Sequence, residues 1–362
     1  MLQLVFGRSG YGKTEYIRNR IADMIDRGET QVLLITPEQY SFISEYSLLE
    51  QLGEARAHAV RCLSFSRLCD ECDRLYGADG RKLLTKGGKA ILMKTAIDQV
   101  RPDLELFEKK GSSAAFVQSM TGIYDEMKSC NLSGAAVYAA ADDLDTDILR
   151  CKMRDFSRIM TAYEALLGDR FADPANRLTR LYDQIKDQNY FAGQTVFLDG
   201  FNGFVAQEYK ILERIIAEAK AVYIALDSDS FGTGDGYDLF AYVNETAGIL
   251  QRIADKAGVP TNALQLGENY RTDYADLRRV EQYIFADQAP ETEISSEHIR
   301  LYAASTVTDA CNDLALQIKG LLRCGYRAGE IAVTMRDREK YAPVLASAFE
   351  KYGVPYYTDE RQ

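Results

Sequence analysis

The sequence predicts an α/β fold, with a parallel sheet flanked by helices, a helical insertion and the start of a second α/β domain. Short apolar segments of strand length alternate with helical patterns, and a glycine-rich turn separates the first such segment from the first helix. Strands that alternate with helices form parallel sheets with both faces covered. The 362 residues are enough for two or three folded units, at roughly 150 residues per domain.

The first strands are predicted from short apolar runs near the N-terminus. Residues 2–6 predict a strand, the turn after them leads into a helical pattern over 14–26, and residues 32–35 predict a second strand. Residues 60–65 form a third apolar stretch. The helix before that stretch carries large apolar side chains on one face, namely Phe42, Tyr46 and Leu49.

A helical insertion is predicted to interrupt the sheet from about residue 82 to residue 190. Apolar residues spaced alternately four and three apart over 149–167 mark an amphipathic helix. Asp173-Pro174 is expected to cap the next one. Strand signals return at 195–198 and 221–226, with a helix between them.

The rest of the chain predicts a second unit. A polar stretch over 289–297 is typical of a linker, and a strand–helix–strand pattern follows over 299–301, 309–322 and 331–334. We therefore expect three parts. They are a first domain formed by residues 1–80 and 191–290, a helical insertion over residues 81–190, and the beginning of a second, truncated α/β domain over residues 297–362.

Composition and charge exclude several classes of protein. No apolar run approaches the roughly 18 residues of a membrane helix, and Gly7-Arg8 interrupts the first apolar run too early for a signal peptide. We therefore expect a cytoplasmic protein with no membrane partner. The net charge of −11 repels phosphate backbones, so nucleic acid should bind weakly unless a cleft concentrates basic side chains.

Metal-binding patterns are weak. Seven cysteines form no disulfide-like framework, and the close pair Cys69 and Cys72 lacks the second pair or nearby histidines that zinc requires. We interpret these cysteines as ordinary reduced thiols. The acidic cluster over 142–147 is most simply a solvated connection, with a metal site as the alternative.

The strongest functional signal lies between the first strand and the first helix. This segment satisfies G-x-x-x-x-G-K-[ST] at every fixed position; its residues are Gly7, Arg8, Ser9, Gly10, Tyr11, Gly12, Lys13 and Thr14. Glycines let backbone N–H groups turn inward around a polyphosphate, and the helix N-terminus adds positive potential. Lys13 is expected to reach the β- and γ-phosphates of ATP and Thr14 to ligate Mg²⁺. The pattern favours a P-loop NTPase with a RecA-like sheet over a glycine-rich turn with a chance lysine.

A second magnesium contact is expected from Asp199, which follows the strand over 195–198. The alternative is a strand that ends in Asp-Gly because that dipeptide forms a good turn. The next residue is Gly200, where a helicase-type ATPase usually carries a glutamate that polarises the attacking water. Without that carboxylate, general-base assistance of about 10²- to 10⁴-fold is missing unless another residue supplies it.

The phosphate loop and the segments that follow it along the chain resemble the AddB (RexB) family. This family is the second subunit of the bacterial AddAB ATP-dependent helicase–deoxyribonuclease, and its front half is built like a UvrD-type superfamily 1 helicase. The resemblance spans the whole chain, although only the phosphate loop is specific by itself. The similar segments are Leu34 to Phe42, Leu63 to Leu68, Lys152 to Phe156 with Tyr163-Glu164 and Asp173, Asp199-Gly200-Phe201 with Gln207-Glu208, and Arg336-Asp337 with Tyr341 and Gly353 to Tyr356.

The resemblance implies a DNA-repair role in homologous recombination, beside an AddA-type motor–nuclease subunit that acts on double-strand DNA ends. It implies a domain that binds ATP and Mg²⁺, hydrolyses ATP poorly, grips DNA and senses its sequence. The DNA-contacting candidates are the loops after Thr36 and around residues 64–67, with Phe65 alternatively a core aromatic. Family members are far longer, and their exonuclease domain and iron–sulfur cluster lie mostly C-terminal, so this chain looks like an N-terminal fragment without the cluster.

Departures from an active helicase are expected to matter. Only six residues precede Gly7, so the upstream glutamine segment that reads adenine has no counterpart. The strand ending at Asp227 is followed by no sensor glutamine. Glu268-Asn269-Tyr270-Arg271-Thr272 resembles the helicase segment whose arginine approaches the γ-phosphate, which makes Arg271 the candidate arginine finger; a surface arginine is the alternative. Arg336 is a weaker candidate.

Two other functions are open at this point. A stand-alone P-loop ATPase or small-molecule kinase would need a catalytic acid or base beside the phosphate loop, and the sequence offers no convincing one. A non-enzymatic interaction module would keep the fold without the nucleotide. Binding of a fluorescent ATP analogue, with and without Mg²⁺, separates the last from the others.

Overall fold

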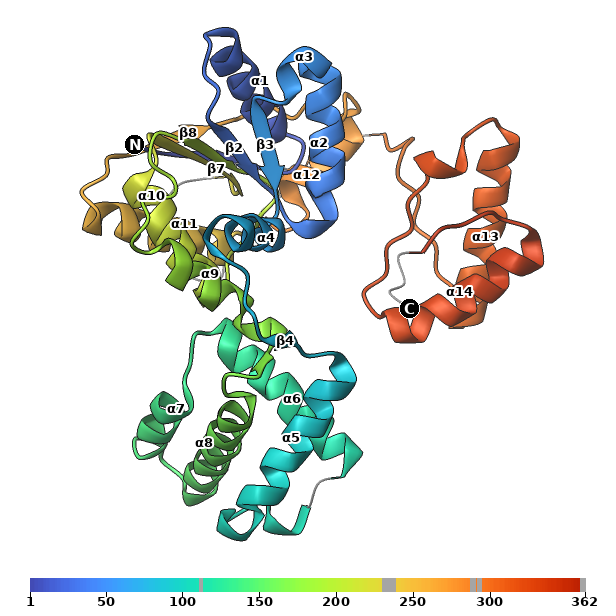
Figure 1. Cartoon of the computed structure of the whole chain (residues 1–362). Coiled ribbons are helices and arrows are strands. Elements are labelled where there is room, and N and C mark those ends of the chain that lie inside the picture. Colours follow the sequence, from blue (N-terminus) through green and yellow to red (C-terminus); the bar gives the residue numbers. More distant parts are fainter. Residues whose placement is uncertain (111–112, 230–238, 287–290, 292–294, 359–362) are drawn as a thin grey trace. The chain divides into compact units, whose positions relative to one another are not determined.

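The computed structural model describes residues 1–110, 113–229, 239–286, 291 and 295–358. The chain divides into two compact units, Met1–Asp273 and Tyr274–Gln362. Figure 1 follows the chain through both of them. The division into three parts expected from the sequence stays a prediction, and most of the expected linker lies outside the described residues.

The first unit is built on a six-stranded sheet in the order β3-β2-β6-β7-β1-β8, with neighbouring strands parallel. Its strands are β1 (Leu2–Gly7), β2 (Val32–Ile35), β3 (Val60–Leu63), β6 (Thr195–Leu198), β7 (Ala221–Asp227) and β8 (Thr261–Gln265). Because all strands run the same way, the turn after β1 and the ends of β6, β7 and β8 meet at one edge of the sheet. This arrangement confirms the predicted α/β fold of the RecA-like P-loop type.

Helices cover both faces of this sheet, as Figure 1 shows. On one face lie α1 (Lys13–Asp26), α2 (Glu38–Leu52) and the short α3 (Glu54–Ala57). On the other face lie α4 (Phe65–Tyr76), α9 (Arg177–Ile185), α10 (Ala206–Glu218) and α11 (Ala241–Lys256). Alternate strand residues enter the two cores: Leu4 and Phe6 pack with the second layer, whereas Leu34 and Phe197 pack with the first. Both faces are therefore buried, as the apolar strands predict.

The helical insertion has its own core. Its helices are α5 (Lys86–Val100), α6 (Ala114–Ser129), α7 (Gly134–Ala141) and α8 (Asp147–Leu167), with the 3₁₀ turns η1 (Arg101–Asp103), η2 (Glu108–Lys110) and η3 (Pro174–Asn176). Two short parallel strands, β4 (Lys82–Leu83) and β5 (Phe171–Ala172), pair where the chain enters and leaves it. Tyr124 and Tyr163 meet edge-to-face in the core, with ring centroids 4.7 Å apart. Asp173 was expected to cap the next helix; it caps η3, the turn that leads into α9, by accepting from the Ala175 amide, and the N-cap residue of α9 itself is Asn176.

The interior of the insertion also contains ion pairs. Asp173 is buried and accepts hydrogen bonds from the Tyr163 hydroxyl (2.6 Å) and from Lys89 Nζ (2.8 Å). Lys89, itself buried, also pairs with Asp125 of α6. A buried charge is tolerated when it is paired and hydrogen-bonded. This network therefore fixes α5, α6 and α8 around the start of η3.

One face of α2 is apolar and yet exposed. Phe42, Tyr46 and Leu49 do share a face of α2, but all three are exposed, with Phe42 at 75%. The residues of α2 that are buried are Ser41, Leu48 and Leu52. α2 packs on the sheet through a narrow contact only, so the wider apolar stripe faces outward.

The second unit contains α12 (Ala275–Tyr283), α13 (Val307–Arg323), the 3₁₀ turn η4 (Ala328–Glu330) and α14 (Arg338–Tyr352). α13 and α14 pack on each other through Ala315, Ile318, Leu345 and Phe349. The expected strands over 299–301 and 331–334 are not formed. Those segments lack a pairing partner within the described residues, and a strand needs one for its backbone hydrogen bonds. Throughout the part of the chain that the structure describes, every helix is too short or too polar to cross a membrane.

Candidate functional site

The glycine-rich loop curls around the N-terminus of α1. Gly10 and Gly12 have φ values of +90° and +79°, a conformation that glycine adopts without strain. A Cβ on Gly10 would lie 2.8 Å from Arg271 Cβ, so this position also requires glycine for space. Successive residues in such conformations turn their amides toward one concave surface, which suits anions. This local geometry is compatible with an anion at the start of α1.

Lys13 starts α1 and folds back over the loop. Its Nζ donates to the carbonyl oxygens of Gly7 (2.7 Å) and Arg8 (2.9 Å). The same nitrogen forms an ion pair with Asp227 at the end of β7. The parallel register, which places Gly7 beside Asp227, brings these groups together. The sequence did not indicate this partner, although Asp227 ends a buried strand at the same sheet edge.

Thr14 and Asp199 lie together, as the expected magnesium site requires. The Asp199 carboxylate accepts a hydrogen bond from the Thr14 side chain, and it is only 9% exposed. Burial raises the pKa of Asp199 above its ordinary value, while the Thr14 and Gly200 hydrogen bonds and the charge of Lys13 act in the opposite direction. A hydroxyl and a carboxylate at one point form a donor set that Mg²⁺ accepts.

The segment over 268–272 closes one side of the loop. The Tyr270 amide donates to the Gly10 carbonyl (2.9 Å), and the Arg271 amide donates to Asn269 Oδ1 (2.8 Å). The Tyr270 ring lies against Gly12, at 3.4 Å from the position a Cβ would take there. These two hydrogen bonds and the ring contact hold Arg271 beside the loop. Arg271 itself is exposed. Tyr270 is a site residue that the sequence did not indicate.

The remaining loop residues support its shape. Arg8 pairs with Asp229 (2.7 Å) and lies over the Phe240 ring. The Tyr11 amide donates to the Arg8 carbonyl (3.1 Å). Ser9 is exposed at the rim of the loop.

These residues converge on one cavity of about 410 Å³, within the range of small-ligand sites. It is lined by Ser9, Gly10, Gly12, Lys13, Thr14, Glu15, Arg18, Asp199, Gly200, Phe201, Ala225, Asp227, Tyr270 and Arg271. Each lining carboxylate has a partner: Glu15 pairs with Arg18 (2.6 Å), Asp199 with Thr14 and Asp227 with Lys13. Among the described lining residues, none is an unengaged carboxylate that could activate water.

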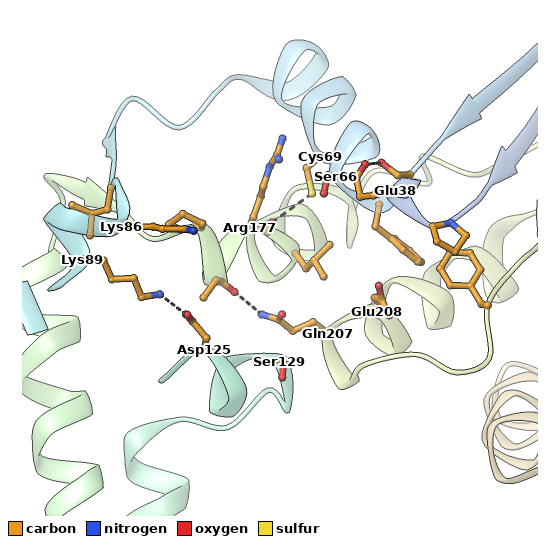
Figure 2. A pocket seen from close by; sticks show the side chains of 18 of the residues that line it. Glu38, Ser66, Cys69, Lys86, Lys89, Asp125, Ser129, Arg177, Gln207 and Glu208 are labelled. Atoms are coloured by element: carbon orange, nitrogen blue, oxygen red, sulfur yellow. Dashed lines mark hydrogen bonds and ion pairs between the residues drawn. The ribbon is translucent and has the colours of Figure 1, made fainter. Parts of the chain in front are cut away.

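A second cavity, of about 670 Å³, lies on the other side of Phe201. Figure 2 shows it between the first turns of α4, α5 and α10. The loops expected to contact DNA both line it, through Thr36 and Glu38 and through Ser64, Phe65 and Ser66. Phe65 is 6% exposed and packs edge-to-face on Phe201, at 5.8 Å between centroids. Phe65 is therefore chiefly a core aromatic, with part of its surface in the cavity wall.

Basic and acidic groups are mixed in this second cavity. Lys86, Lys89 and Arg177 supply the positive charge. Lys89 is held by Asp125 and Asp173, and Arg177 pairs with Asp70. Lys86 is exposed, and it has no carboxylate partner among the described residues. It is therefore the cation of this cavity best placed to meet a phosphate.

The cysteine pair is part of the core of the first unit. Cys69 and Cys72 lie on the buried face of α4. Burial raises the pKa of both thiols to about 12, so both stay protonated at neutral pH. In the acidic cluster, Asp142 pairs with Arg154 at 2.7 Å. The described residues contain no group of three or more His, Cys, Asp or Glu side chains suited to a metal ion.

The parallel sheet, with its glycine loop at the carboxyl edge, defines a protein of the RecA-like P-loop class. The family model described as "ADDB, N-terminal" matches residues 4–281. The chain belongs to this family.

Curated relatives agree with this assignment. The chain is 28% identical over its full length to a protein of Clostridioides difficile (strain 630), whose name is that of the B-type subunit of an ATP-dependent helicase/deoxyribonuclease. Proteins with the same name from Clostridium botulinum (strain Langeland) and Clostridium novyi (strain NT) are 27% and 26% identical over 100% and 99% of this chain. In each case the chain spans 32% of the relative's length.

Proposed function

We propose that this chain is the nucleotide-binding, helicase-like region of an AddB-type subunit. In this role it binds ATP with Mg²⁺, hydrolyses ATP poorly by itself, and contributes DNA gripping and sequence sensing beside a motor–nuclease subunit of the AddA type. The whole assembly would process double-strand DNA ends for recombinational repair. The names of the relatives support the last point, because each is called a subunit of an ATP-dependent helicase/deoxyribonuclease.

One observation supports nucleotide binding above all others: the loop, the Thr14–Asp199 pair and Arg271 surround the same cavity. The backbone amides would hold the phosphates, and Thr14 with Asp199 would hold Mg²⁺. The ion would neutralise phosphate charge. Arg271 would add a positive charge at the open side of the phosphates.

Poor hydrolysis is supported by what surrounds the phosphate position. A water needs a general base to become a good nucleophile. Gly200 carries no side chain where a helicase-type enzyme has its glutamate, and two of the three carboxylates that line the cavity, Glu15 and Asp199, are engaged with Arg18 and Thr14. The third, Asp227, pairs with Lys13 and does not occupy the position of that glutamate after β6. Binding without rapid turnover suits a domain that responds to nucleotide while another subunit supplies the motion.

The DNA-contacting role is supported by the second cavity. It combines a cation at Lys86, a hydroxyl at Ser66 and two aromatic side chains, Phe65 and Phe201. Polynucleotide strands are held by such mixtures of phosphate contacts and stacking. Phe201 lines both cavities, so a strand in one would lie next to the nucleotide in the other.

The test is a titration with a fluorescent ATP analogue, with and without Mg²⁺. We expect saturable binding that Mg²⁺ strengthens, and a loss of about 10- to 100-fold in Lys13→Ala, because a hydrogen bond to a charged group is removed. Lys94→Ala, on the exposed side of α5, is the matched control and should bind as the unaltered chain does. Absent binding, or binding unaffected by Lys13→Ala, would exclude the proposal. Rapid DNA-stimulated hydrolysis by this chain alone would contradict its second part.

A further inference from the structure

The ammonium group of Lys13 already has a full set of acceptors. It carries three donor hydrogens, and it contacts three acceptors: the carbonyls of Gly7 and Arg8 and the carboxylate of Asp227. Its side chain is only 10% exposed. A phosphate can therefore reach Lys13 only by replacing one of these three partners.

Asp227 is the partner that can be replaced. The two carbonyls belong to the loop that carries the lysine, so they move with it. Asp227 comes from a different strand, lines the cavity, and is 43% exposed in its side chain. An incoming phosphate and the Asp227 carboxylate are both anions directed at the same nitrogen. They compete for it.

The surrounding charge strengthens this competition. Asp199 lies in the same cavity, and the negative charge of Asp227 is one of the influences that raise its pKa. A triphosphate that displaces Asp227 from Lys13 leaves that carboxylate near both Asp199 and the phosphates. A divalent cation on Thr14 and Asp199 offsets part of this repulsion.

We propose that Asp227 sets the nucleotide affinity of this site as an internal competitor for Lys13. Without nucleotide, Asp227 occupies the side of the Lys13 ammonium group that faces the cavity, while the two loop carbonyls hold the lysine over the loop. Nucleotide binding exchanges the Lys13–Asp227 ion pair for a Lys13–phosphate contact. The site then binds weakly unless Mg²⁺ accompanies the nucleotide. This inference rests on the proposed ATP binding and concerns the regulation of the same site.

The experiment compares the dissociation constants of Mg²⁺–ATP for the unaltered chain and for Asp227→Asn. We expect Asp227→Asn to bind about 3- to 10-fold more tightly, the effect of removing a partly exposed ion pair that binding must break. The dependence on Mg²⁺ should become weaker. Asp227→Glu keeps the competing charge and should stay within about threefold of the unaltered chain.

Glu15→Gln is the matched control. It removes one negative charge from the same cavity, but Glu15 pairs with Arg18 and does not contact Lys13. General relief of repulsion would favour binding equally in both variants, whereas competition for Lys13 predicts a clearly larger gain in Asp227→Asn. An equal gain in the two variants, or no gain in a folded Asp227→Asn, would overturn the inference.

The outcomes also separate this inference from the function on which it rests. If neither the unaltered chain nor Asp227→Asn binds Mg²⁺–ATP, the proposed function fails together with the inference. If the unaltered chain binds and Asp227→Asn gains nothing, only the competition is excluded. Should Asp227→Asn not fold, Asp227→Ser decides the question by the same comparison of dissociation constants. Tighter binding of Mg²⁺–ATP than by the unaltered chain is expected, and unchanged or weaker binding would exclude the competition.

Discussion

Gly200 connects a backbone angle with the chemistry of the proposed nucleotide site. Its φ is +82°, and a Cβ there would lie 3.4 Å from Pro37 Cδ. An L-residue in this conformation is destabilised by roughly 1–2 kcal/mol. The backbone conformation at position 200 therefore favours glycine over glutamate, independently of the chemistry that glutamate would supply.

Gly200→Glu tests this interpretation. We expect the variant to lower the thermal unfolding midpoint and to leave ATP turnover within about threefold of the unaltered chain, because the new carboxylate would displace the loop rather than reach the water position. ATP turnover is measured as phosphate release with and without single-stranded DNA. An increase of about 100-fold or more, the size of a restored general base, would show that the missing carboxylate alone limits hydrolysis.

Asp199 predicts a dependence on pH. A carboxylate must be deprotonated to bind a metal ion, and burial raises the pKa of Asp199 above the ordinary 3.8. The Mg²⁺-dependent part of ATP affinity should therefore fall on acidification, starting at a higher pH than an ordinary aspartate would give. Isothermal titration over a pH series checks this, with Asp199→Asn as the variant that should lose both the Mg²⁺ effect and its pH dependence.

The same shift has a defined sign for stability. Between the ordinary pKa and the raised folded-state pKa, the folded chain holds more protons on Asp199 than the unfolded chain does. The contribution of this group to the free energy of unfolding therefore decreases as pH rises through that interval. Bound Mg²⁺ should remove this decrease, because it favours the deprotonated carboxylate in the folded chain.

At the scale of elements, α2 gives a direct test of which helix face carries packing energy. Phe42 is 75% exposed, whereas Leu48 on the packed side of the helix is 3% exposed. We expect Phe42→Ser to change the free energy of unfolding by less than about 0.5 kcal/mol and Leu48→Ala to lower it by about 2–5 kcal/mol. Denaturant unfolding measures both. A large loss in Phe42→Ser would mean that the apolar face is covered in the folded chain.

Among the strands, the sequence predicted those that are buried on both faces. β2 and β6 lie where their apolar runs predicted, because a strand buried on both faces is apolar throughout. β8 escaped prediction because it is an edge strand with three of its five residues exposed, and Thr261–Gln265 carries few apolar residues. The outward face of α2 could not be inferred, because an apolar stripe does not reveal whether anything packs on it.

For the candidate site, the sequence indicated residues but not their contacts. The loop pattern identified Lys13 and Thr14, and strand-end position identified Asp199, since both signals are local in sequence. The Lys13–Asp227 ion pair and the Tyr270–Gly10 hydrogen bond join segments more than 200 residues apart. Such contacts follow from strand order and register, which a single sequence does not specify.

At the scale of the whole molecule, net charge opposes the proposed DNA contact. The chain carries −11, and two of the three cations in the second cavity are already paired with carboxylates. Few counterions would be released on binding a single strand. The chain alone should therefore bind DNA weakly and with a shallow salt dependence, and tighter binding would require surfaces outside it.

Lys86 provides the final prediction. A single strand releases about 0.7 counterion per phosphate contact, so one or two contacts predict a slope of log affinity against log salt of roughly −0.7 to −1.4. Lys86→Ala should weaken oligonucleotide binding similarly for all base sequences and make this slope shallower by about 0.7. Lys94→Ala removes the same charge from the same helix but outside the cavity, so fluorescence anisotropy should show a clearly smaller effect. If the two variants weaken binding equally, the attraction arises from the overall field of the molecule, and the second cavity is not where the strand lies.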